Sequence, residues 1–455
     1  MTFLQFFGGV GEIGGNKILL EDGDVKIWLD FGQSFKMGMD YFTGWLQPRP
    51  QNGLGDYFEF NLLPTVQGLY AEHFLFSTPM RYKKPVFDAV FLSHAHFDHV
   101  NHISFIDPTI PVYCGSCTKL FLEASEETGS GIYFGEHDYQ RFRTGDKIKI
   151  RGLEVEPIHV DHSIPAAYGF IIHTSAGAVV YTGDIRAHGP KHEMTEEFLA
   201  KAAEVAPVAL ISEGTRMVSK ERRRNLSEAE VLRGLDAILA EKDNSNRSVF
   251  YTHNSRDTDR FHTFYSAAES HGRKVVVTSR TAYTLSKLIA DEHIDLPNPL
   301  TDDIISVYYR RKRSGEYQEK DYYSWERPFL DKMVTASVIR KNPKGYIMDL
   351  GFNCFTELID IFFRPRASSP FIYSMSEPFD EDDIESQVMQ NWLNHFSLEY
   401  HQLHASGHMS RRDLEQAIRH VNPKKLFPVH TENPELFKKS FDRVVLPEKS
   451  KRYTL

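Results

Sequence analysis

Four side chains that commonly bind metal ions lie within six consecutive positions of the stretch Ser93-His94-Ala95-His96-Phe97-Asp98-His99. An apolar run, Asp88-Ala89-Val90-Phe91-Leu92, directly precedes it and predicts a buried strand. Neutral imidazoles and a carboxylate suit Zn²⁺ or a similar divalent ion, and a short loop places such side chains around a shared point. The H-x-H-x-D-H pattern therefore predicts a metal site at the end of this strand, and a chance cluster on a polar loop is the weaker interpretation.

The length and charge of the chain limit which classes of protein it can be. With 455 residues it is long for one core, so we expect two or three domains. A charged share of 25% is typical of a folded chain rather than a disordered one. The formal net charge of −9 argues against a wholly basic protein that coats nucleic acid, although a local basic groove would still bind phosphates.

Neither a membrane segment nor a disulfide framework is expected. No apolar run approaches the length that spans a bilayer, and the first residues lack the basic region and apolar core of a signal peptide, so we expect a cytoplasmic location. Among three cysteines, Cys114 and Cys117 form a C-x-x-C that lacks the second pair of a zinc knuckle. We expect ordinary reduced thiols, with a redox role as the less favoured alternative.

Short strand-like runs separated by glycines fill the first part of the chain. Their close spacing predicts an antiparallel or mixed sheet; they are Phe3–Phe7, Lys17–Leu20 and Val25–Leu29. The glycine stretch 8–16 precedes a strand rather than a helix, so we expect it to allow close backbone approach to the site rather than to bind a dinucleotide. The segment Met37–Tyr82, rich in Pro, Gly and aromatic residues, is expected to be an insertion that lids or borders a site.

The pattern changes after Asp184. Up to that residue strands recur from Val155 onward, whereas beyond it helical patterns alternate with strand-like runs. The helix Ser227–Leu239 has a capping pair in Ser227 and Glu230. The strand-like runs are Ser248–Thr252, Lys274–Thr278, Gly345–Asp349 and Pro370–Tyr373. This alternation predicts a separate α/β layer at about 214–390, after which short strands and one helix, Arg411–His420, return.

Three more segments carry a ligand-type residue at the end of an apolar run. These residues are His162, Asp184 and His430. Taken singly, Asp184 could be an ordinary turn residue, and His162 and His430 could be ordinary surface histidines. Taken together with residues 94–99, they supply the nitrogens and the bridging carboxylate of a two-metal site.

The order of these motifs resembles a known family. The H-x-H-x-D-H pattern, then His162-Ser163-Ile164-Pro165, then Tyr181-Thr182-Gly183-Asp184 resembles the metallo-β-lactamase fold, and Leu29-Asp30-Phe31-Gly32 resembles its first, structural Asp motif. Glu213, His408 and His430 resemble the acidic and histidine motifs of its β-CASP nuclease branch. The glycine stretch 8–16 and Ala405-Ser406-Gly407-His408 are most similar to ribonuclease J.

This resemblance covers nearly the whole chain and implies a fold. The fold class is α/β, a metallo-β-lactamase αββα sandwich with an inserted α/β β-CASP domain. The expected domains are residues 1–213 as the first part of the metallo-β-lactamase domain, 214–390 as the β-CASP insertion and 391–455 as the last part.

The resemblance also implies roles for individual residues. One metal ion would be held by His94, His96 and His162, the other by Asp98, His99 and His430, with Asp184 bridging both. The ions would be Zn²⁺, with Mn²⁺ also accepted by these ligands. Asp30 would orient a ligand, and His408, oriented by Glu213, would donate a proton to the leaving oxygen or stabilise its charge. Substrate binding is expected at Ser406, by its match to the family, and at Arg280, because it follows a strand-like run.

The expected activity is that of a metal-dependent ribonuclease. A histidine in the last motif, here His430, favours RNA over DNA in this family, and ribonuclease J implies 5′-to-3′ exonuclease action on single-stranded RNA with endonuclease action left open. The basic clusters 222–224 and 308–313 fit either an RNA channel or a solvated face. A DNA nuclease, a small ester or thioester hydrolase on the same metal fold and a non-catalytic scaffold are the alternatives, and a homodimer is left open.

Three departures from the family pattern stand out. The run Val100-Asn101-His102 replaces a glycine-containing turn, and Ser374-Met375-Ser376-Glu377-Pro378 only partly matches the segment that closes the family's phosphate pocket. The chain also ends soon after His430, so we expect no counterpart of the family's extra C-terminal domain and no oligomerisation through it.

Overall fold

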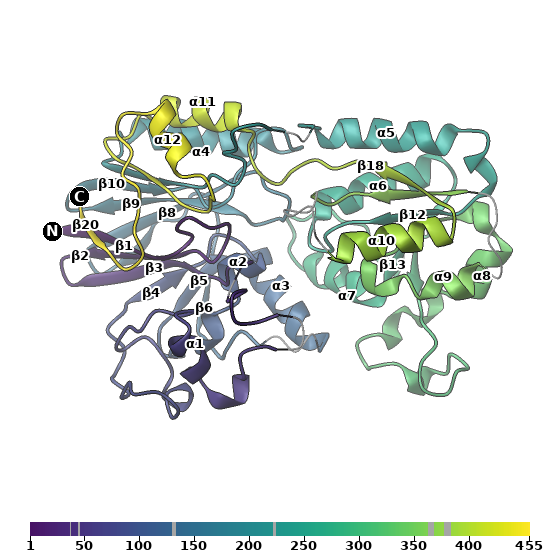
Figure 1. Ribbon diagram of the computed structural model, residues 1–455, viewed down its shortest axis with the longest axis horizontal. Coiled ribbons are helices and arrows are strands. Elements are labelled where there is room, and N and C mark those ends of the chain that lie inside the picture. Colours follow the sequence, from purple (N-terminus) through teal and green to yellow (C-terminus); the bar gives the residue numbers. More distant parts are fainter. Residues whose placement is uncertain (37, 44–45, 130–132, 222–223, 363–367, 377–383) are drawn as a thin grey trace.

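The computed structural model describes residues 1–455 except 37, 44–45, 130–132, 222–223, 363–367 and 377–383. The described residues form three β-sheets arranged in two halves (Figure 1). One half holds the first two sheets and both ends of the chain, and the other half holds the third sheet. No described helix has both the length and the apolar character needed to cross a membrane.

The first two sheets pack face to face as a sandwich. The first has the order β20-β1-β2-β3-β4-β5-β6, and the second has the order β19-β11-β10-β9-β8-β7. The strands of the first sheet are β1 (Thr2–Gly8), β2 (Lys17–Asp22), β3 (Val25–Phe31), β4 (Ala89–Phe91), β5 (Val112–Gly115), β6 (Tyr139–Phe142) and β20 (Arg452–Thr454). Those of the second are β7 (Ile148–Ile150), β8 (Leu153–His159), β9 (Tyr168–Thr174), β10 (Gly177–Tyr181), β11 (Ala209–Ser212) and β19 (Leu426–Pro428).

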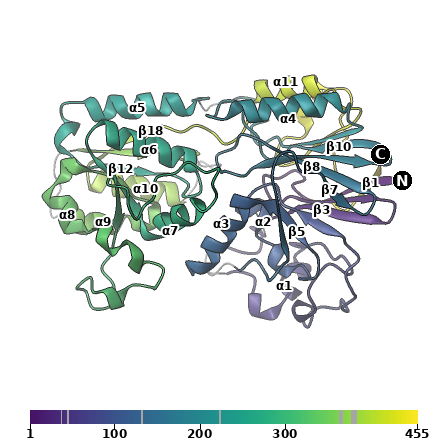
Figure 2. The same ribbon diagram turned by 180° about the vertical axis from the view of Figure 1, so that it is seen from behind.

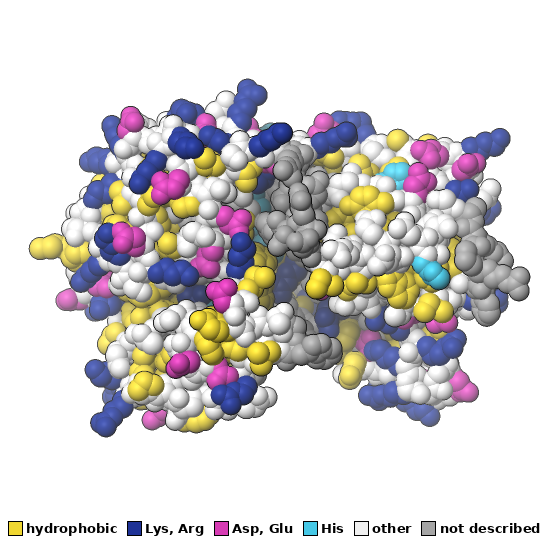
Figure 3. All heavy atoms as spheres, viewed as in Figure 1, with side chains coloured by type: hydrophobic (Ala, Val, Ile, Leu, Met, Phe, Trp, Pro, Cys, Tyr) yellow, Lys and Arg dark blue, Asp and Glu magenta, His cyan; other side chains and the backbone are white. Residues whose placement is uncertain are grey.

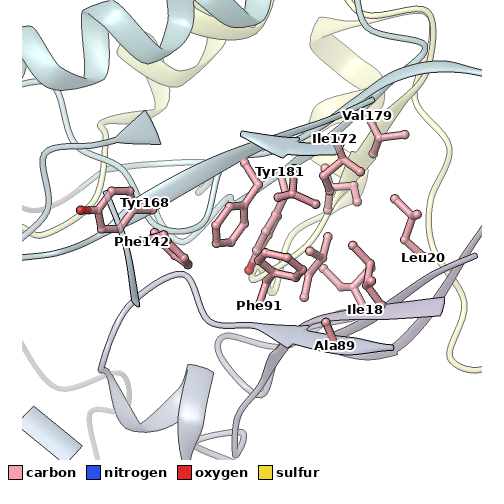
Figure 4. Close-up of a cluster of buried hydrophobic side chains, with 14 of the residues drawn as sticks. Ile18, Leu20, Ala89, Phe91, Phe142, Tyr168, Ile172, Val179 and Tyr181 are labelled. Carbon is pink, nitrogen blue, oxygen red and sulfur yellow. The ribbon is translucent and has the colours of Figure 1, made fainter. Parts of the chain in front are cut away.

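The core between these sheets follows from strand periodicity. Along β1, every second side chain is buried, because side chains alternate between the two faces of a strand. The buried side chains of both sheets meet in one cluster, in which Phe91 of the first sheet lies near Tyr181 of the second (Figure 4). The Phe91 ring also contacts Phe170 of the second sheet, with centroids 5.8 Å apart. The strand predicted before the metal-ligand stretch is β4, and the predicted β8, β9 and β10 also form.

Different elements cover the outer faces of the sandwich. The outer face of the second sheet is covered by α4 (His192–Glu204), α11 (Arg411–Val421) and α12 (Glu435–Ser440). The outer face of the first sheet is covered by the segment that includes α1 (Gly55–Glu59), whose apolar residues pack around Trp28 and Phe31. The segment predicted as an insertion therefore supplies a second core beneath the sheet.

The third sheet is entirely parallel and has helices on both faces. Its order is β15-β14-β13-β16-β12-β17-β18. Its strands are β12 (Val249–Thr252), β13 (Lys274–Thr278), β14 (Ile305–Tyr308), β15 (Met333–Val334), β16 (Tyr346–Asp349), β17 (Ser369–Tyr373) and β18 (Leu398–Gln402). One face packs against α5 (Glu228–Ala240), α6 (Thr258–Ser270) and α7 (Ser279–Leu288), and the other against α8 (Ala336–Lys341), α9 (Glu357–Ile361) and α10 (Ile384–His395).

Two details of this layer bear on the sequence predictions. The capping box predicted at the start of α5 is present, with Ser227 and Glu230 bonded to each other's backbone N–H. The boundary expected at residue 390 falls inside α10, and β18 beyond it still pairs with β17. The strands of the layer therefore extend to Gln402, because β18 needs the free edge of β17 to complete its backbone hydrogen bonds.

Candidate metal centre

The predicted ligands converge at the carboxyl ends of strands from both sheets of the sandwich. Residues 94–99 follow β4 and include α2 (Phe97–Val100), while His162, Asp184 and His430 follow β8, β10 and β19. Strand ends from two facing sheets meet at one edge, so segments far apart in the sequence come together there. The structure brings all seven predicted ligands into two overlapping groups that share Asp184.

Three imidazoles form the first group. The Nε2 atoms of His94 and His162 each lie 3.0 Å from Nδ1 of His96. The Asp184 Oδ2 atom lies 3.6 Å from Nε2 of His94 and 3.8 Å from Nε2 of His162. Four ligand-type atoms therefore surround one point.

The second group has two imidazoles and two carboxylates. The His430 Nε2 atom lies 2.8 Å from Asp98 Oδ2, and His99 Nε2 lies 3.5 Å from that same oxygen. The Asp184 Oδ2 atom lies 3.2 Å from His99 Nε2 and 3.8 Å from His430 Nε2. Asp184 thus faces both groups from between them.

These distances and the state of the atoms fit divalent metal ions. Tetrahedral Zn²⁺ with bonds of about 2.0–2.1 Å places its ligand atoms roughly 3.3–3.4 Å apart. The atoms of each group lie within 4.8 Å of one another, and most neighbouring pairs are close to the tetrahedral separation. No described residue forms a hydrogen bond with His99 Nε2 or Asp184 Oδ1, and both atoms are buried. Leaving buried polar atoms unbonded is costly unless a cation satisfies them.

Burial and the neighbouring carboxylates shift the pKa values of the histidines in opposite directions in the two groups. Burial holds the pKa of His94 and of His162 well below the usual range, and it lowers the pKa of His96 to about 4. Those imidazoles are therefore neutral, as metal ligands must be. Burial also opposes protonation of His430, but the carboxylates Asp184 and Asp98 outweigh it and raise the pKa of His430 to about 9. The second group thus attracts positive charge.

Asp30 holds one ligand from behind. Its carboxylate accepts hydrogen bonds from His99 Nδ1 at 2.8 Å, Tyr181 Oη at 2.6 Å and Ser93 Oγ at 2.8 Å. The backbone N–H of Ser93 donates a further bond of 2.7 Å. With Nδ1 engaged in this way, His99 turns Nε2 toward the site, which is the orienting role predicted for Asp30.

The glycine stretch 8–16 lies directly against the metal-ligand loops. The Gly15 and Asn16 N–H groups donate to the Asp98 carbonyl at 2.9 and 3.2 Å, and the His430 N–H donates to the Gly9 carbonyl at 2.8 Å. Gly14 has φ +78°, and a Cβ there would lie 2.8 Å from Asp98 Oδ2. Only glycine fits this position, which confirms the predicted close approach of the backbone.

His408 and Glu213 lie beside the ligand cluster. The His408 Nδ1 atom lies 3.0 Å from Glu213 Oε1 and 4.0 Å from Asp184 Oδ2. Glu213 is held in turn by the N–H groups of Ile185 at 3.2 Å and Thr215 at 3.0 Å. The His408 side chain is 20% exposed, so it borders the open side of the site.

A cleft of about 480 Å³ opens in front of the cluster, between the two halves of the molecule (Figure 3). Ser406, which was predicted to bind substrate, lines it together with Ser374, Ser376 and His404 from the second half. The predicted Arg280 lies elsewhere, exposed in the first turn of α7 and not among the residues that line the cleft. Phe35 also lines the cleft, but no described residue from 38 to 82 does. The segment predicted to lid or border the site therefore does not line the cleft itself, and only Phe35, just before it, does.

Two arginines line the cleft, Arg216 and Arg256, and neither was predicted. Arg256 donates to the Ala95 carbonyl inside the metal-ligand loop and to Ser125 Oγ at 3.1 Å. The signal available in the sequence was its place shortly after the strand-like run Ser248–Thr252, since loops after parallel strands carry ligand contacts.

A buried charge network also escaped prediction. Arg186, fully buried, donates to Asp161 Oδ1 at 2.9 Å and pairs with Asp259 of α6 in the other half. Nearby, Arg260 binds Glu228 at 2.8 Å and donates to the carbonyls of Ser374 and Ala405. This network ties the loops of His162 and Asp184 to the loops that line the far side of the cleft.

Comparisons with known proteins agree with this geometry. Residues 62–242 match a family described as "Beta-lactamase superfamily domain", and residues 395–441 match one described as "Zn-dependent metallo-hydrolase RNA specificity domain". The second match contains His408 and His430.

Several curated relatives cover most of this chain. It is 23% identical over 367 residues to Ribonuclease J 2 of Streptococcus pyogenes, covering 76% of this chain and 60% of that protein. It is 25% identical over 361 residues to Ribonuclease J of Sinorhizobium meliloti, covering 76% and 58%, and 23% identical over 439 residues to Ribonuclease J of Thermus thermophilus, covering 93% and 67%. The chain therefore spans about 60% of the length of the first two relatives.

A solved structure shares the fold over its whole length. A protein of unknown function from Enterococcus faecalis V583 superposes with a TM-score of 0.77 at 24% sequence identity, covering 100% of both chains.

Proposed function

We propose, from the premise that this chain is a ribonuclease J-like protein of the metallo-β-lactamase superfamily, that it hydrolyses RNA phosphodiester bonds with divalent metal ions. One observation carries the proposal: six other ligand-type side chains converge on Asp184, and a histidine held by a glutamate lies 4.0 Å from that same carboxylate. A small-ester hydrolase has no need of this second histidine on the open side of the site.

The ligand sets support two metal ions, and Zn²⁺ is the ion we propose. When bound, two such cations lower the pKa of water and neutralise charge on a phosphoryl group, which is what phosphodiester hydrolysis needs. The protein's own task is to place the ligands, and Asp30 and the glycine stretch do so by fixing His99 and Asp98. The carboxylate of Asp184 faces both ligand groups and would contribute a ligand to each.

His408 is proposed as the proton donor to the leaving oxygen. Its Nδ1 is engaged by Glu213, so Nε2 is the ring nitrogen available to the cleft. The hydrogen bond to the Glu213 carboxylate fixes the orientation of the imidazole ring, which a general acid needs. Ser406 and Arg256, which line the same cleft, would contact the phosphate groups of the substrate.

RNA is the proposed substrate, and single-stranded RNA its form. The match to an RNA specificity domain over residues 395–441 and the histidine at position 430 support RNA over DNA. The direction of attack, 5′-to-3′, and the capacity for internal cuts follow only from the likeness to ribonuclease J. Both are therefore matters for the first experiment.

The first test compares nucleic acids that differ only in their ends. We expect the Zn²⁺- or Mn²⁺-loaded protein to degrade 5′-monophosphorylated RNA faster than RNA with a 5′-triphosphate or a 5′-hydroxyl, and to leave a DNA of the same sequence largely intact. Release of mononucleotides with a circular RNA untouched indicates an exonuclease, and a linearised circle indicates an endonuclease. Metal-replete protein that leaves every RNA intact would rule out the proposal.

The role of His408 gives a second prediction. His408→Ala should lower kcat on RNA by about 100-fold to 10,000-fold, the usual contribution of a general acid, and should leave the metal content unchanged. The loss should be much smaller with bis(p-nitrophenyl) phosphate, whose leaving group needs no proton. Glu213→Gln should reproduce the same pattern more weakly. Equal losses on both substrates would mean that His408 acts through the metals instead.

A further inference from the structure

An ordered arm projects from the half that holds the third sheet. This arm, residues 309–332, links β14 to β15 and forms the loop at the lower right of Figure 1. Tyr309, Tyr322 and Phe329 anchor it in the core of that half. Its tip is closed by Asp321, which accepts from Ser314 Oγ at 2.5 Å and from the Gln318 N–H at 3.0 Å. The arm is therefore shaped before any ligand binds, which lowers the entropic cost of binding.

The surface of the arm is basic although the chain is acidic. Residues 309–332 contain seven Lys and Arg against five Asp and Glu, whereas the whole chain has a net charge of −9. Two of the five carboxylates, Asp321 and Glu326, are buried in the arm's own hydrogen bonds. Four exposed cations, Arg311, Arg313, Lys320 and Arg327, form no ion pair with any carboxylate in the part of the chain that is described. Figure 3 shows Lys and Arg side chains gathered on this lobe.

An aromatic pair, with one ring exposed and the other half-buried, lies among these cations. Tyr323 is 56% exposed, and its ring stacks on Trp325 with centroids 6.1 Å apart and planes 10° apart. Lys312 Nζ lies 5.0 Å from the centre of the Tyr323 ring, and Arg313 lies 5.9 Å from it. Aromatic rings flanked by cations bind single-stranded nucleic acid, because bases stack on the rings while the cations bind the phosphates. A duplex offers no free base faces for such stacking.

A continuous chain of contacts joins this arm to the metal cleft. Arg256, which lines the cleft, binds Ser125 of α3 (Ser116–Glu127). Glu127, at the end of α3, accepts from Tyr283 of α7 at 2.5 Å, and the Tyr283 ring contacts Trp325 with centroids 5.8 Å apart. Helices α3 and α7 lie side by side in both Figure 1 and Figure 2. The cleft and the arm therefore lie at the two ends of one series of contacting residues.

We propose that the arm 309–332 binds the single-stranded part of the RNA that extends beyond the metal cleft, with Tyr323 stacking on a base and Arg311 and Arg313 binding phosphates. This rests on the proposed function, since it assigns the arm to the same substrate. The arm would raise the affinity for long RNA and leave the chemical step unchanged, because it lies apart from the reacting atoms.

The kinetic test uses full-length, metal-loaded protein and RNAs of two lengths. Tyr323→Ala and the double variant Arg311→Gln/Arg313→Gln should each raise KM by about fivefold or more for an RNA of about 20 nucleotides, with kcat unchanged. Both should cleave a dinucleotide like the parent protein. Tyr323→Phe, which keeps the ring, and Lys438→Gln/Lys439→Gln on the distant α12 should match the parent on both substrates. A KM for long RNA that stays unchanged would overturn the proposal.

An equilibrium test separates the arm from the catalytic activity. Binding of labelled RNA is measured by fluorescence anisotropy in an Asp184→Asn background, so the result stands even if no RNA is ever cleaved. The double arginine variant should reduce the salt slope by roughly 0.7 for each phosphate that the arm no longer neutralises. Tyr323→Ala should weaken binding to single-stranded RNA but not to RNA made abasic opposite the arm. Equal weakening for duplex RNA and heparin would show a general polyanion surface and overturn the stacking assignment.

Discussion

Replacing Asp184 by alanine is expected to lower the rate of RNA hydrolysis by roughly 1,000-fold or more, a loss of about 4 kcal/mol of transition-state stabilisation. The carboxylate faces both ligand groups, with Oδ2 within 3.8 Å of Nε2 on His94, His99, His162 and His430. Its removal takes one ligand from each group at once. Metal content, measured by inductively coupled plasma mass spectrometry, should fall together with activity.

The fold is expected to survive this change. The two halves bury extensive apolar cores that do not include Asp184, so the circular dichroism spectrum of Asp184→Ala should match that of the parent. Glu432→Gln provides a matched control, since it removes a carboxylate two residues from His430 that pairs instead with Lys36. It should retain both metal content and kcat. A variant that keeps its metal and its rate without Asp184 would contradict the bridging role.

The second large effect is expected at Arg186. Arg186→Met should destabilise the protein by about 3–5 kcal/mol, because removing one partner of a buried ion pair leaves the other charge uncompensated. Here Asp161 and Asp259, which belong to different halves of the molecule, would both lose Arg186, and Asp259 would keep only the partly exposed Lys191 at 3.9 Å. Urea unfolding of the metal-loaded protein should show the loss. RNA hydrolysis should fall as well, since Asp161 precedes the ligand His162.

Lys191→Met is the control for this prediction. Lys191 also approaches Asp259, at 3.9 Å, but its side chain is 44% exposed, so its ion pair is screened by water. We expect a change within about 0.5 kcal/mol. If Arg186→Met were no more destabilising than Lys191→Met, the network would not be what holds the two halves together.

Sequence reasoning singled out the residues that the structure gathers at the candidate metal centre, because their signal is local. Each of these residues closely follows a run of apolar residues that predicts a strand, as Asp184 follows the run that ends at Tyr181. The same holds for the Ser227 capping box and for the close approach of the glycine stretch, which both appear in the structure. Patterns read over a few residues survive folding when tertiary contacts reinforce them.

The local signal does not decide which loop residues line the cleft. Arg280 and Arg256 both follow a strand of the third sheet, and only the packing of that sheet against the sandwich decides that Arg256 lines the cleft. The position of β18 beyond residue 390 depends in the same way on the free edge of β17. Neither the order of strands in a sheet nor the choice of loops that line a cleft can be predicted from residues that are neighbours in the chain.

The sequence by itself determined the chemistry of this protein: a dense set of imidazoles and carboxylates at strand ends, which has few uses besides metal binding. The tertiary structure alone decided how that chemistry is held and reached. Arg186 reads in the sequence as an ordinary charged residue, and it becomes fully buried only because Asp161, 25 positions before it, and Asp259, 73 positions after it, meet at its side chain. The physical reason is that burial and charge pairing are properties of contacts between distant segments, which exist only once the chain has folded.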